Sequence, residues 1–337
     1  MIGNDDLRVA VIIPAYRAAA TIEQVIAGIP DWVDTIYVVD DASPDGTDAH
    51  ARAAADPRAR VLHHGVNRGV GAAMVTGYRE AMRDGIDICV KMDADNQMDP
   101  DYLEELIEPL LAGRADYAKG NRWHNSEALH PIRQAMPRAR FVGNAGLSFL
   151  IKAASGQWHI FDPTNGYTAI HRTALHAIDL GALHPRYFFE SSMLIALRRV
   201  HAVVEDVRMP ARYGAKTTHL SIARTLIEFL WLSLRGGLGR LIWQYFVEDF
   251  SAVSLFLLSG IPLVTFGIAF GAYHWIDSYH RNVLTPTGTV MLATLPLILG
   301  FELLLQALVL DVQNVPTKPL QAARPAARLH GASRPTN

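Results

Sequence analysis

The stretch Val90-Lys91-Met92-Asp93-Ala94-Asp95-Asn96-Gln97 decides how the rest of the chain is interpreted. An apolar run from Ile86 to Met92 predicts a buried β-strand, and two carboxylates two residues apart follow it directly. Because side chains alternate along a strand, Asp93 and Asp95 are expected on one side of the point where the strand ends. Carboxylate oxygens there can hold Mg²⁺ or Mn²⁺, which then take substrate phosphates as further ligands. Asp-Ala-Asp also occurs as a polar strand end before a helix, so the motif alone leaves both interpretations open.

Composition narrows the class of protein. The 337 residues suffice for two units, and 50% of them are hydrophobic against 19% charged, with the apolar excess near the C-terminus. A formal net charge of −2 provides no overall basic field, so nucleic acid is not expected as a partner. The single cysteine, Cys89, excludes an internal disulfide. The first apolar run, Val9 to Ile13, is too short for a signal peptide, so we expect the N-terminal domain to stay in the cytosol.

Upstream of the central stretch, apolar runs alternate with helical patterns. Strands are expected at 7–13, 35–39, 61–63 and 86–92, with helices at 21–27, 47–55 and 71–83 between them. This alternation predicts an α/β domain whose mainly parallel sheet carries helices on both faces. Ligands of such sheets bind beyond the carboxyl ends of the strands. Pro14, Asp40-Asp41 and the Asp93–Asp95 pair all stand at such ends, which predicts a polar rim on one edge of the sheet.

Several common nucleotide and metal sites are excluded by residue type. The first strand is followed by Pro14-Ala15-Tyr16-Arg17 without a glycine, and Met74 occupies the third glycine position of the run that begins at Gly69. The chain has no Gly-x-x-x-x-Gly-Lys-Ser/Thr segment either, so neither a dinucleotide fingerprint nor a P-loop is present. The histidines lack metal-ligand spacing, and the adjacent His63 and His64 are interpreted as structural.

Four motifs lie within residues 7 to 122: Ile13-Pro14-Ala15-Tyr16, Val38 to Thr47 (VVDDASPDGT), Asn67 to Ala73 (NRGVGAA) and Asp93 to Gln97 (DADNQ). Together they resemble the family 2 inverting glycosyltransferases of GT-A fold. Within that family, the Asp-Ala-Asp-x-Gln form and the segment Lys119-Gly120-Asn121-Arg122-Trp123 are similar to the dolichol-phosphate mannosyltransferase group, which glycosylates polyprenyl phosphates. Arg17 departs from that group, which often has asparagine at this position.

The resemblance implies roles for individual side chains. Mg²⁺ or Mn²⁺ would bind to Asp93, Asp95 and Gln97, with Asp95 among the catalytic residues. A UDP- or GDP-linked sugar would be held by residues of the strand ends and of the glycine-containing loop, namely Pro14, Ala15, Tyr16, Asp41, Gly69, Asp93 and Ala94.

A phosphate group that accepts the sugar would be bound by positively charged side chains. Its second pKa is about 6, so it is largely dianionic at neutral pH and needs no strong base. Four basic side chains are candidates for holding it: Arg122, Arg140, Arg212 and Lys216. Asp162 is the candidate base or a group that orients the acceptor, although it can also simply begin a turn before Pro163. Glu190, at an expected helix N-terminus, fits a pocket role or a favourable interaction with the helix dipole.

Two long apolar segments follow, from Ser251 to Tyr273 and from Thr285 to Leu310. At about 1.5 Å per residue each is long enough to cross a hydrocarbon core of about 30 Å. Glu302, inside the second segment, is costly unless it faces another helix or subunit, and a homo-oligomer is one interpretation.

The flanks of these segments predict their orientation. The tail after Asp311 contains Lys318, Arg324, Arg328 and Arg334, whereas the turn between the segments contains Arg281 against Asp277. Positive-inside bias therefore places the catalytic domain and both termini in the cytosol, in a multi-pass protein of the cell membrane. Between residues 222 and 247, apolar side chains recur at helical spacing, and we expect Gly236-Gly237 to split two short amphipathic helices that lie along the membrane surface. The alternative for these helices is packing against the catalytic domain.

These observations predict a GT-A domain at 1–220, amphipathic juxtamembrane helices at 221–249, two transmembrane helices at 250–311 and a flexible basic cytosolic tail at 312–337. The predicted reaction is metal-dependent, inverting transfer of one sugar from a nucleotide sugar to a polyprenyl phosphate, undecaprenyl or dolichyl, at the cytosolic membrane face. One alternative acceptor is a hydroxyl of a saccharide or glycolipid. Another alternative is an inactive membrane scaffold that only binds nucleotide sugars, which the intact Asp93, Asp95 and Gln97 disfavour.

Overall fold

The computed structural model describes residues 7–122, 138–210 and 222–323, and within these the side chains of 138–142, 144 and 222–226 are not described. The chain forms two compact units, one from residues 1–237 with 316–337 and one from residues 238–315. The division of the chain into functional segments at residues 220, 249 and 311 stays a prediction.

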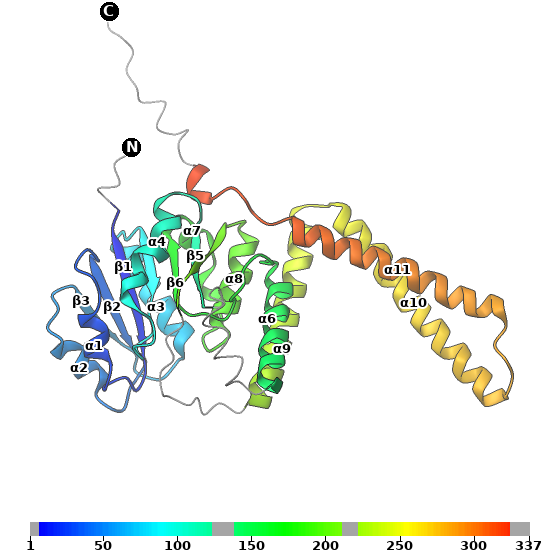
Figure 1. The fold of residues 1–337 in the computed structure, drawn as a ribbon, viewed down its shortest axis with the longest axis horizontal. Helices are drawn as coiled ribbons and strands as arrows, with labels where there is room; N and C mark the ends of the chain where they lie inside the picture. Colours follow the sequence, from blue (N-terminus) through cyan, green and yellow to red (C-terminus); the bar gives the residue numbers. More distant parts are fainter. Residues whose placement is uncertain (1–6, 123–137, 211–221, 324–337) are drawn as a thin grey trace, which may run out of the picture. The chain divides into compact units, whose positions relative to one another are not determined.

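The first unit is built on a seven-stranded sheet of order β3-β2-β1-β4-β6-β5-β7 (Figure 1). The strands are β1 (Val9–Ala15), β2 (Thr35–Asp40), β3 (Ala59–His63), β4 (Ile88–Lys91), β5 (Tyr117–Asn121), β6 (Thr168–His171) and β7 (Val204–Arg208). β6 runs antiparallel to β4 and β5, and the other neighbours are parallel. The predicted mainly parallel α/β sheet is thereby confirmed.

Strand β1 is buried on both faces, which is why its sequence is a nearly continuous apolar run. It pairs in parallel with β2 and β4, with Ala15 opposite Asp40 and Ile12 opposite Lys91. The carboxyl ends of these three strands therefore meet at one edge, directly before Tyr16, Asp41 and Met92. The polar rim expected from the sequence exists in the fold.

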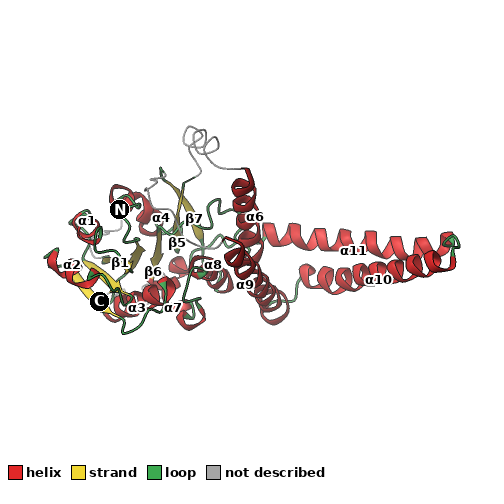
Figure 2. Ribbon diagram, turned by 90° about the horizontal axis from the view of Figure 1, so that it is seen from below, coloured by secondary structure: helices red, strands yellow, loops and turns green. Residues whose placement is uncertain are grey.

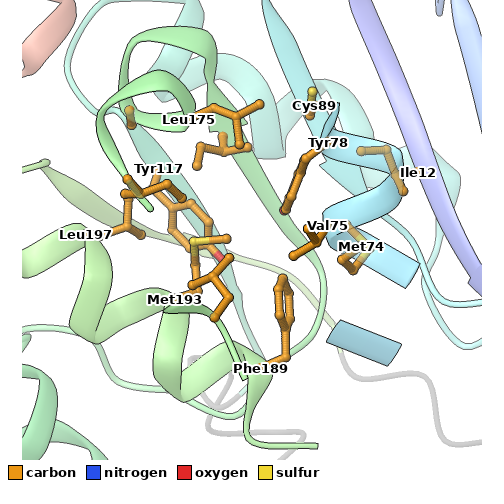
Figure 3. Packing of buried hydrophobic residues seen from close by; sticks show 14 of the residues in the cluster. Ile12, Met74, Val75, Tyr78, Cys89, Tyr117, Leu175, Phe189, Met193 and Leu197 are labelled. Atoms are coloured by element: carbon orange, nitrogen blue, oxygen red, sulfur yellow. The ribbon is translucent and has the colours of Figure 1, made fainter. Parts of the chain in front are cut away.

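Helices cover both faces of this sheet (Figure 2). They are α1 (Ile22–Ala27), α2 (Thr47–Ala53), α3 (Val70–Arg83), α4 (Leu103–Leu111), α6 (Arg138–Ser155), α7 (Arg172–Ala177) and α8 (Phe189–Arg199), with 3-10 turns η1 (Pro100–Tyr102) and η2 (Leu180–Ala182). Alternate residues of β1 serve the two faces, since Ile12 lies in one core cluster and Val11 in the other. Figure 3 shows the cluster of Ile12, to which α3 contributes Val75 and Tyr78 and α8 contributes Phe189. This packing fixes the start of α8 near the rim.

Helix α9 (Ile222–Ile242) corrects one prediction, because it runs without a break through Gly236-Gly237. A glycine in a helix interior costs only about 1 kcal/mol. Here the two glycines allow close packing, since a Cβ on Gly236 would lie 2.7 Å from the Ile195 side chain and one on Gly237 would lie 2.9 Å from the Ala154 backbone. The regular helix ends instead at a π-helical turn, η3 (Trp243–Glu248). Sequence reasoning mistook a packing requirement for a helix break.

Helix α9 still has an exposed apolar side, formed by Ile227, Leu230, Trp231 and Leu234. Its other side, with Phe229 and Leu232, packs against a cluster that includes Ile195 of α8. Of the two alternatives left open by the sequence, packing against the catalytic domain therefore applies to one side of the helix. The exposed side keeps the amphipathic character that was predicted.

The second unit contains α10 (Ala252–Arg281) and α11 (Thr287–Gln313), two long helices that lie side by side (Figures 1 and 2). Both are long and apolar enough to cross a membrane, in agreement with the two predicted spans. Small residues allow their close approach, since a Cβ on Gly260 would lie 3.0 Å from the carbonyl oxygen of Gly300. At one end of this unit, Arg240 forms a buried ion pair with Asp311.

After α11 the chain returns to the first unit and forms the short turn η4 (Leu320–Ala323). The fully buried Asp116 accepts hydrogen bonds from the backbone N–H of Leu320 (2.9 Å) and of Gln321 (3.2 Å). The Gln321 side chain donates to the carbonyl oxygens of Leu110 and Ala115. This part of the chain differs from the flexible tail expected at 312–337, of which residues 324–337 lie outside the described residues.

Candidate active site

The carboxylate motif lies where β4 ends. Asp93 and Asp95 stand in a tight loop in which Asn96 has a positive φ of 60°, a conformation that asparagine tolerates well. The backbone N–H of Gln97 donates to Asp95 Oδ1 at 3.1 Å, which orders the loop. Asp93, Asp95 and Gln97 all line one cavity of about 390 Å³. The structure thus brings the three predicted metal ligands to one surface.

Other elements complete this first cavity. The loop before β6 contributes Thr164, Asn165 and Gly166, and Arg122 lies just after β5. The start of α8 contributes Glu190 and Ser191, and Tyr187 precedes it. The cavity therefore combines carboxylates, neutral oxygens and an arginine, which suits a ligand with phosphate groups.

Lys91 lies beneath this cavity and was not singled out by sequence reasoning. Its side chain is buried, with Nζ 2.6 Å from Asp93 Oδ1 and 3.3 Å from Glu190 Oε1, and it also donates to the Gly166 carbonyl oxygen. Burial alone would lower the pKa of Lys91, but the neighbouring carboxylates of Asp93 and Glu190 outweigh it and raise the pKa above its ordinary value. A charged ammonium group therefore orients Asp93 from below.

The donor set of the first cavity fits a hard divalent cation. Within the described residues, no group of three His, Cys, Asp or Glu side chains is close enough to hold a metal. Asp93 and Asp95 with the Gln97 amide oxygen would supply part of a coordination shell. Mg²⁺ usually keeps waters and binds through one or two carboxylates plus substrate phosphates. Such a cation would be held jointly by the protein and a phosphate-bearing ligand.

A second cavity of about 260 Å³ lies beside the ends of β1 and β2. Five of the seven predicted donor-binding residues line it: Pro14, Ala15, Tyr16, Asp41 and Gly69. Asn67 and Arg186 line it as well; Asn67 belongs to a motif quoted above but was not predicted as a site residue, and Arg186 was not singled out from the sequence. Tyr187 lines both cavities, so the two are neighbours. Ala94 lines neither, because its side chain is buried; its carbonyl oxygen accepts a hydrogen bond from Thr21 Oγ1.

Asp41 organises the wall of this second cavity. Its buried carboxylate accepts hydrogen bonds from the backbone N–H of Arg68 (2.9 Å) and of Gly69 (2.7 Å). His64 Nδ1 lies 2.7 Å from Asp41 Oδ1, which agrees with the structural interpretation of this histidine. Gly69 has a φ of 98°, which favours glycine. The geometry therefore gives Asp41 the task of holding the loop, in addition to any contact with a ligand.

Asp162 and Arg122 form an ion pair at the edge of the first cavity. Arg122 Nε lies 2.8 Å from Asp162 Oδ2, and Thr164 Oγ1 donates to Asp162 Oδ1. Burial alone would raise the pKa of Asp162, but hydrogen bonds and charge from Arg122, with the charge of Lys119, hold it below its usual range. A carboxylate held this way accepts protons poorly, and Asp162 is not among the cavity-lining residues. The arrangement favours an orienting role, through Arg122, over a role as base.

The other predicted acceptor contacts are not described. Arg140 lies in α6, but its side chain is outside the described part, and Arg212 and Lys216 fall in 211–221, also outside it. Met209 and Pro210, directly before that segment, line the first cavity. Glu190, left open by the sequence, proves to line the cavity and to contact Lys91.

Known proteins resemble this domain in sequence. Residues 10–179 match the family described as glycosyl transferase family 2. The chain is 34% identical over 249 residues to the polyprenol monophosphomannose synthase of Mycolicibacterium smegmatis, covering 69% of this chain and 89% of that protein. It is 32% identical to the undecaprenyl-phosphate mannosyltransferase of Micrococcus luteus, covering 60% of this chain and 82% of that protein.

A further relative is the UDP-N-acetylglucosamine–dolichyl-phosphate N-acetylglucosaminyltransferase of Methanococcus voltae, 29% identical with 65% of this chain and 90% of that protein covered. Among solved structures, glucosyl-3-phosphoglycerate synthase from Mycobacterium tuberculosis, crystallised with Mn²⁺, UDP and glucosyl-3-phosphoglycerate, superposes with a TM-score of 0.51. That match covers 69% of this chain and 80% of the other at 22% identity, so it speaks for a shared fold.

Proposed function

The chain belongs to glycosyl transferase family 2 and is a glycosyltransferase, and on that premise we propose that it transfers one sugar, with inversion, from a nucleotide sugar to a polyprenyl phosphate. The observation that carries this proposal is that Asp93, Asp95, Gln97 and Arg122 face one cavity. One wall of the cavity thus suits a metal-bound diphosphate, and another offers a cation for a second phosphate.

The donor would occupy both cavities. Its nucleoside would lie against Pro14, Ala15 and Tyr16, and its diphosphate and sugar would extend past Tyr187 into the larger cavity. A divalent cation on Asp93, Asp95 and Gln97 would neutralise the charge that grows on the leaving diphosphate. Lys91 would hold Asp93 in position for this task, because its ammonium group contacts one carboxylate oxygen.

The acceptor phosphate would be positioned by Arg122. Two nitrogen atoms of this guanidinium group donate to the Asp162 carboxylate, which fixes the orientation of the group beside the cavity. A dianionic phosphate already carries its nucleophilic oxygen, so Asp162 need not accept a proton. The names of the three curated relatives, which specify polyprenyl, undecaprenyl and dolichyl phosphates, support this acceptor class.

The position of Glu190 supports a second candidate for the acceptor, a hydroxyl group of a saccharide or glycolipid. A hydroxyl acceptor must lose a proton to a base within hydrogen-bond reach. Glu190 lines the cavity together with Asp93, so a saccharide or glycolipid hydroxyl near the metal site would find a carboxylate there. Its ion pair with Lys91 speaks for the phosphate acceptor, because the carboxylate is already engaged below the cavity.

We further propose that the catalytic unit and the C-terminal segment lie on the cytosolic side. Two spans return a chain to the side from which it started, and the hydrogen bonds between Asp116 and η4 require both segments on one side. The basic residues beyond Gln313 support the cytosolic assignment.

The reaction is tested by incubating membranes with radiolabelled UDP- and GDP-sugars and polyprenyl phosphate, and then extracting with organic solvent. We expect label in a lipid that survives mild base and is lost in mild acid, the behaviour of a glycosyl phosphate. An acid-stable labelled glycolipid would favour the hydroxyl acceptor. Nucleotide-sugar binding without transfer to any acceptor would favour the inactive scaffold.

Arg122→Gln separates the acceptor role from the donor role. The substitution removes the charge but keeps a polar side chain, so the KM for polyprenyl phosphate should rise about tenfold or more. The KM for the nucleotide sugar should change much less, and Arg199→Gln, outside both cavities, serves as the matched control. Equal changes in both KM values would contradict the assignment of Arg122 to the acceptor.

A further inference from the structure

Glu302 is exposed on the surface of α11, inside a helix apolar enough to cross a membrane. It lies roughly three turns before the helix ends at Gln313, which is about 16 Å at 1.5 Å per residue. The glutamate side chain is too short to reach the headgroups from that depth. Ionisable side chains within membrane spans are rare and almost always face another helix or a water-filled cavity.

The second helix of the same unit does not cover this side chain. Gly300 and Ala307 are buried on the side of α11 that meets α10, and Gly300 makes close contacts there with Gly260 and Val264. Gln306, one turn after Glu302, donates to its Oε1 at 3.0 Å. The second carboxylate oxygen of Glu302 and the amide oxygen of Gln306 make no hydrogen bond to the described residues. The pair therefore keeps unused hydrogen-bonding capacity on its outer side.

A regular stripe of exposed apolar residues passes through Glu302. Its members alternate four and three positions apart: Met291, Leu295, Ile298, Glu302, Leu305 and Val309. This 3.5-residue repeat is the spacing with which two helices pair along a shared seam. Much of α11 is exposed, and the polar pair of Glu302 and Gln306 is what distinguishes this line from its neighbours.

We propose that this stripe, together with Gln306, binds the same stripe of a second copy of the chain. Copies in one membrane share one orientation, so their α11 helices can pair in parallel about an axis along the membrane normal. In that arrangement, the two Glu302 side chains lie at one level of the seam, and the Gln306 amide of each copy, one turn further on, supplies a donor for the carboxyl group of the other. A lipid phosphate is a poorer occupant, because it carries no amide donor for the Glu302 carboxyl group. A single polar residue in an apolar seam also fixes the register of the pair.

Cysteine cross-linking in native membranes tests the face. Val309→Cys places a thiol in the stripe, and Leu308→Cys places one at nearly the same depth outside it, with parent side chains 40% and 41% exposed. Cys89 is buried, so it is not expected to form cross-links of its own. We expect the Val309→Cys protein to form a cross-linked dimer with about tenfold higher yield than the Leu308→Cys protein. Equal yields, or no cross-link from either, would overturn the proposal.

Two substitutions test the polar pair itself, with purified protein in nanodiscs and its mass as the readout. Glu302→Gln keeps hydrogen-bonding groups and should stay dimeric. Glu302→Leu is more compatible with lipid, so insertion is not at risk, yet the dimer dissociation constant should rise about tenfold. An unchanged constant in Glu302→Leu would contradict a role for the pair. A wild-type protein that is monomeric when pure would point to a different membrane protein on this face and overturn the proposal.

Discussion

Two buried cations, Lys91 of the catalytic unit and Arg240 of the helical unit, occupy opposite kinds of surroundings. Both side chains are 1% exposed. The partner of Arg240, Asp311, is 5% exposed, and the two groups meet through nitrogen–oxygen distances of 2.7 and 3.1 Å. The partners of Lys91 reach a cavity, since Asp93 is 36% and Glu190 is 16% exposed.

The two ion pairs differ in whether a carboxylate oxygen remains accessible to a ligand. Asp311 also accepts a hydrogen bond from Tyr245, and Arg240 donates to Gln244, so that cluster is closed within the protein. Asp93 gives one oxygen to Lys91 and presents the carboxylate to the cavity. Burial of a charge alone does not indicate function. The informative quantity is whether its counter-ion faces a space that a ligand can fill.

The largest expected effect is on stability, from Arg240→Met. It leaves the Asp311 carboxylate buried without its counter-ion, which typically costs about 3–5 kcal/mol. Thermal unfolding in detergent measures the loss. The double variant Arg240→Met/Asp311→Leu removes both charges and should recover most of the stability. If the single variant unfolds like the wild type, the cluster is not the closed structural unit described above.

Asp93→Asn should mainly affect catalysis. Loss of a carboxylate that holds a metal and its diphosphate is expected to reduce kcat by about 10²–10³-fold. The unfolding temperature should change little, because Glu190 remains as a counter-ion for the buried Lys91 and the new amide oxygen can still accept its hydrogen bond. Transfer assays together with Mn²⁺ titration of the apo-protein check this. Full activity with unchanged metal response would remove Asp93 from the metal site.

Lys91→Met provides the direct contrast with Arg240→Met. It removes an equally buried cation, but its carboxylate partners can turn toward water in the cavity. Activity should fall about 10–100-fold, as is common when a group that orients a metal ligand is lost. The loss of stability should be clearly smaller than for Arg240→Met. A stability loss as large as that of Arg240→Met would show that the two cations are equivalent.

The smallest effect concerns the pH dependence of stability at the Arg122–Asp162 pair. The pKa of folded Asp162 lies below its unfolded value near 4, so the pair contributes fully above that value. Its contribution is lost as pH falls further, toward the folded pKa. Asp162→Asn should therefore flatten the decline in stability below pH 4, by less than about 2 kcal/mol. An unchanged acid-unfolding curve in Asp162→Asn would contradict the lowered pKa.

The sequence predicted the features that depend on neighbours along the chain. Strand β4 and its carboxylate exit are local, and so are the two long apolar helices. The roles of Lys91 and Asp41 were not accessible in this way, because their partners come from distant segments. Glu190 reaches Lys91 from α8, and the backbone of Arg68 and Gly69 reaches Asp41 from the loop after β3.

Glycines show the same division between local and distant causes. In sequence, Gly236-Gly237 has the composition of a helix break. In the fold, the pair marks where α9 passes close to Ile195 and Ala154, which only the three-dimensional packing reveals. Gly69, with its φ of 98°, belongs to a loop motif that is visible in the sequence, and it lines the second cavity, while its role in donor binding stays a prediction.

The contact between Asp116 and η4 has a consequence for how the protein is made. Leu320 is separated from Asp116 by 204 residues, and both long apolar helices are synthesised between them. N-terminal segments emerge from the ribosome first, so the sheet can form while the Asp116 carboxylate still lacks two of its hydrogen-bond donors. The last step in completing the catalytic unit therefore follows the synthesis of both helices. A chain in which η4 did not reach the first unit would leave the buried Asp116 carboxylate short of two hydrogen-bond donors.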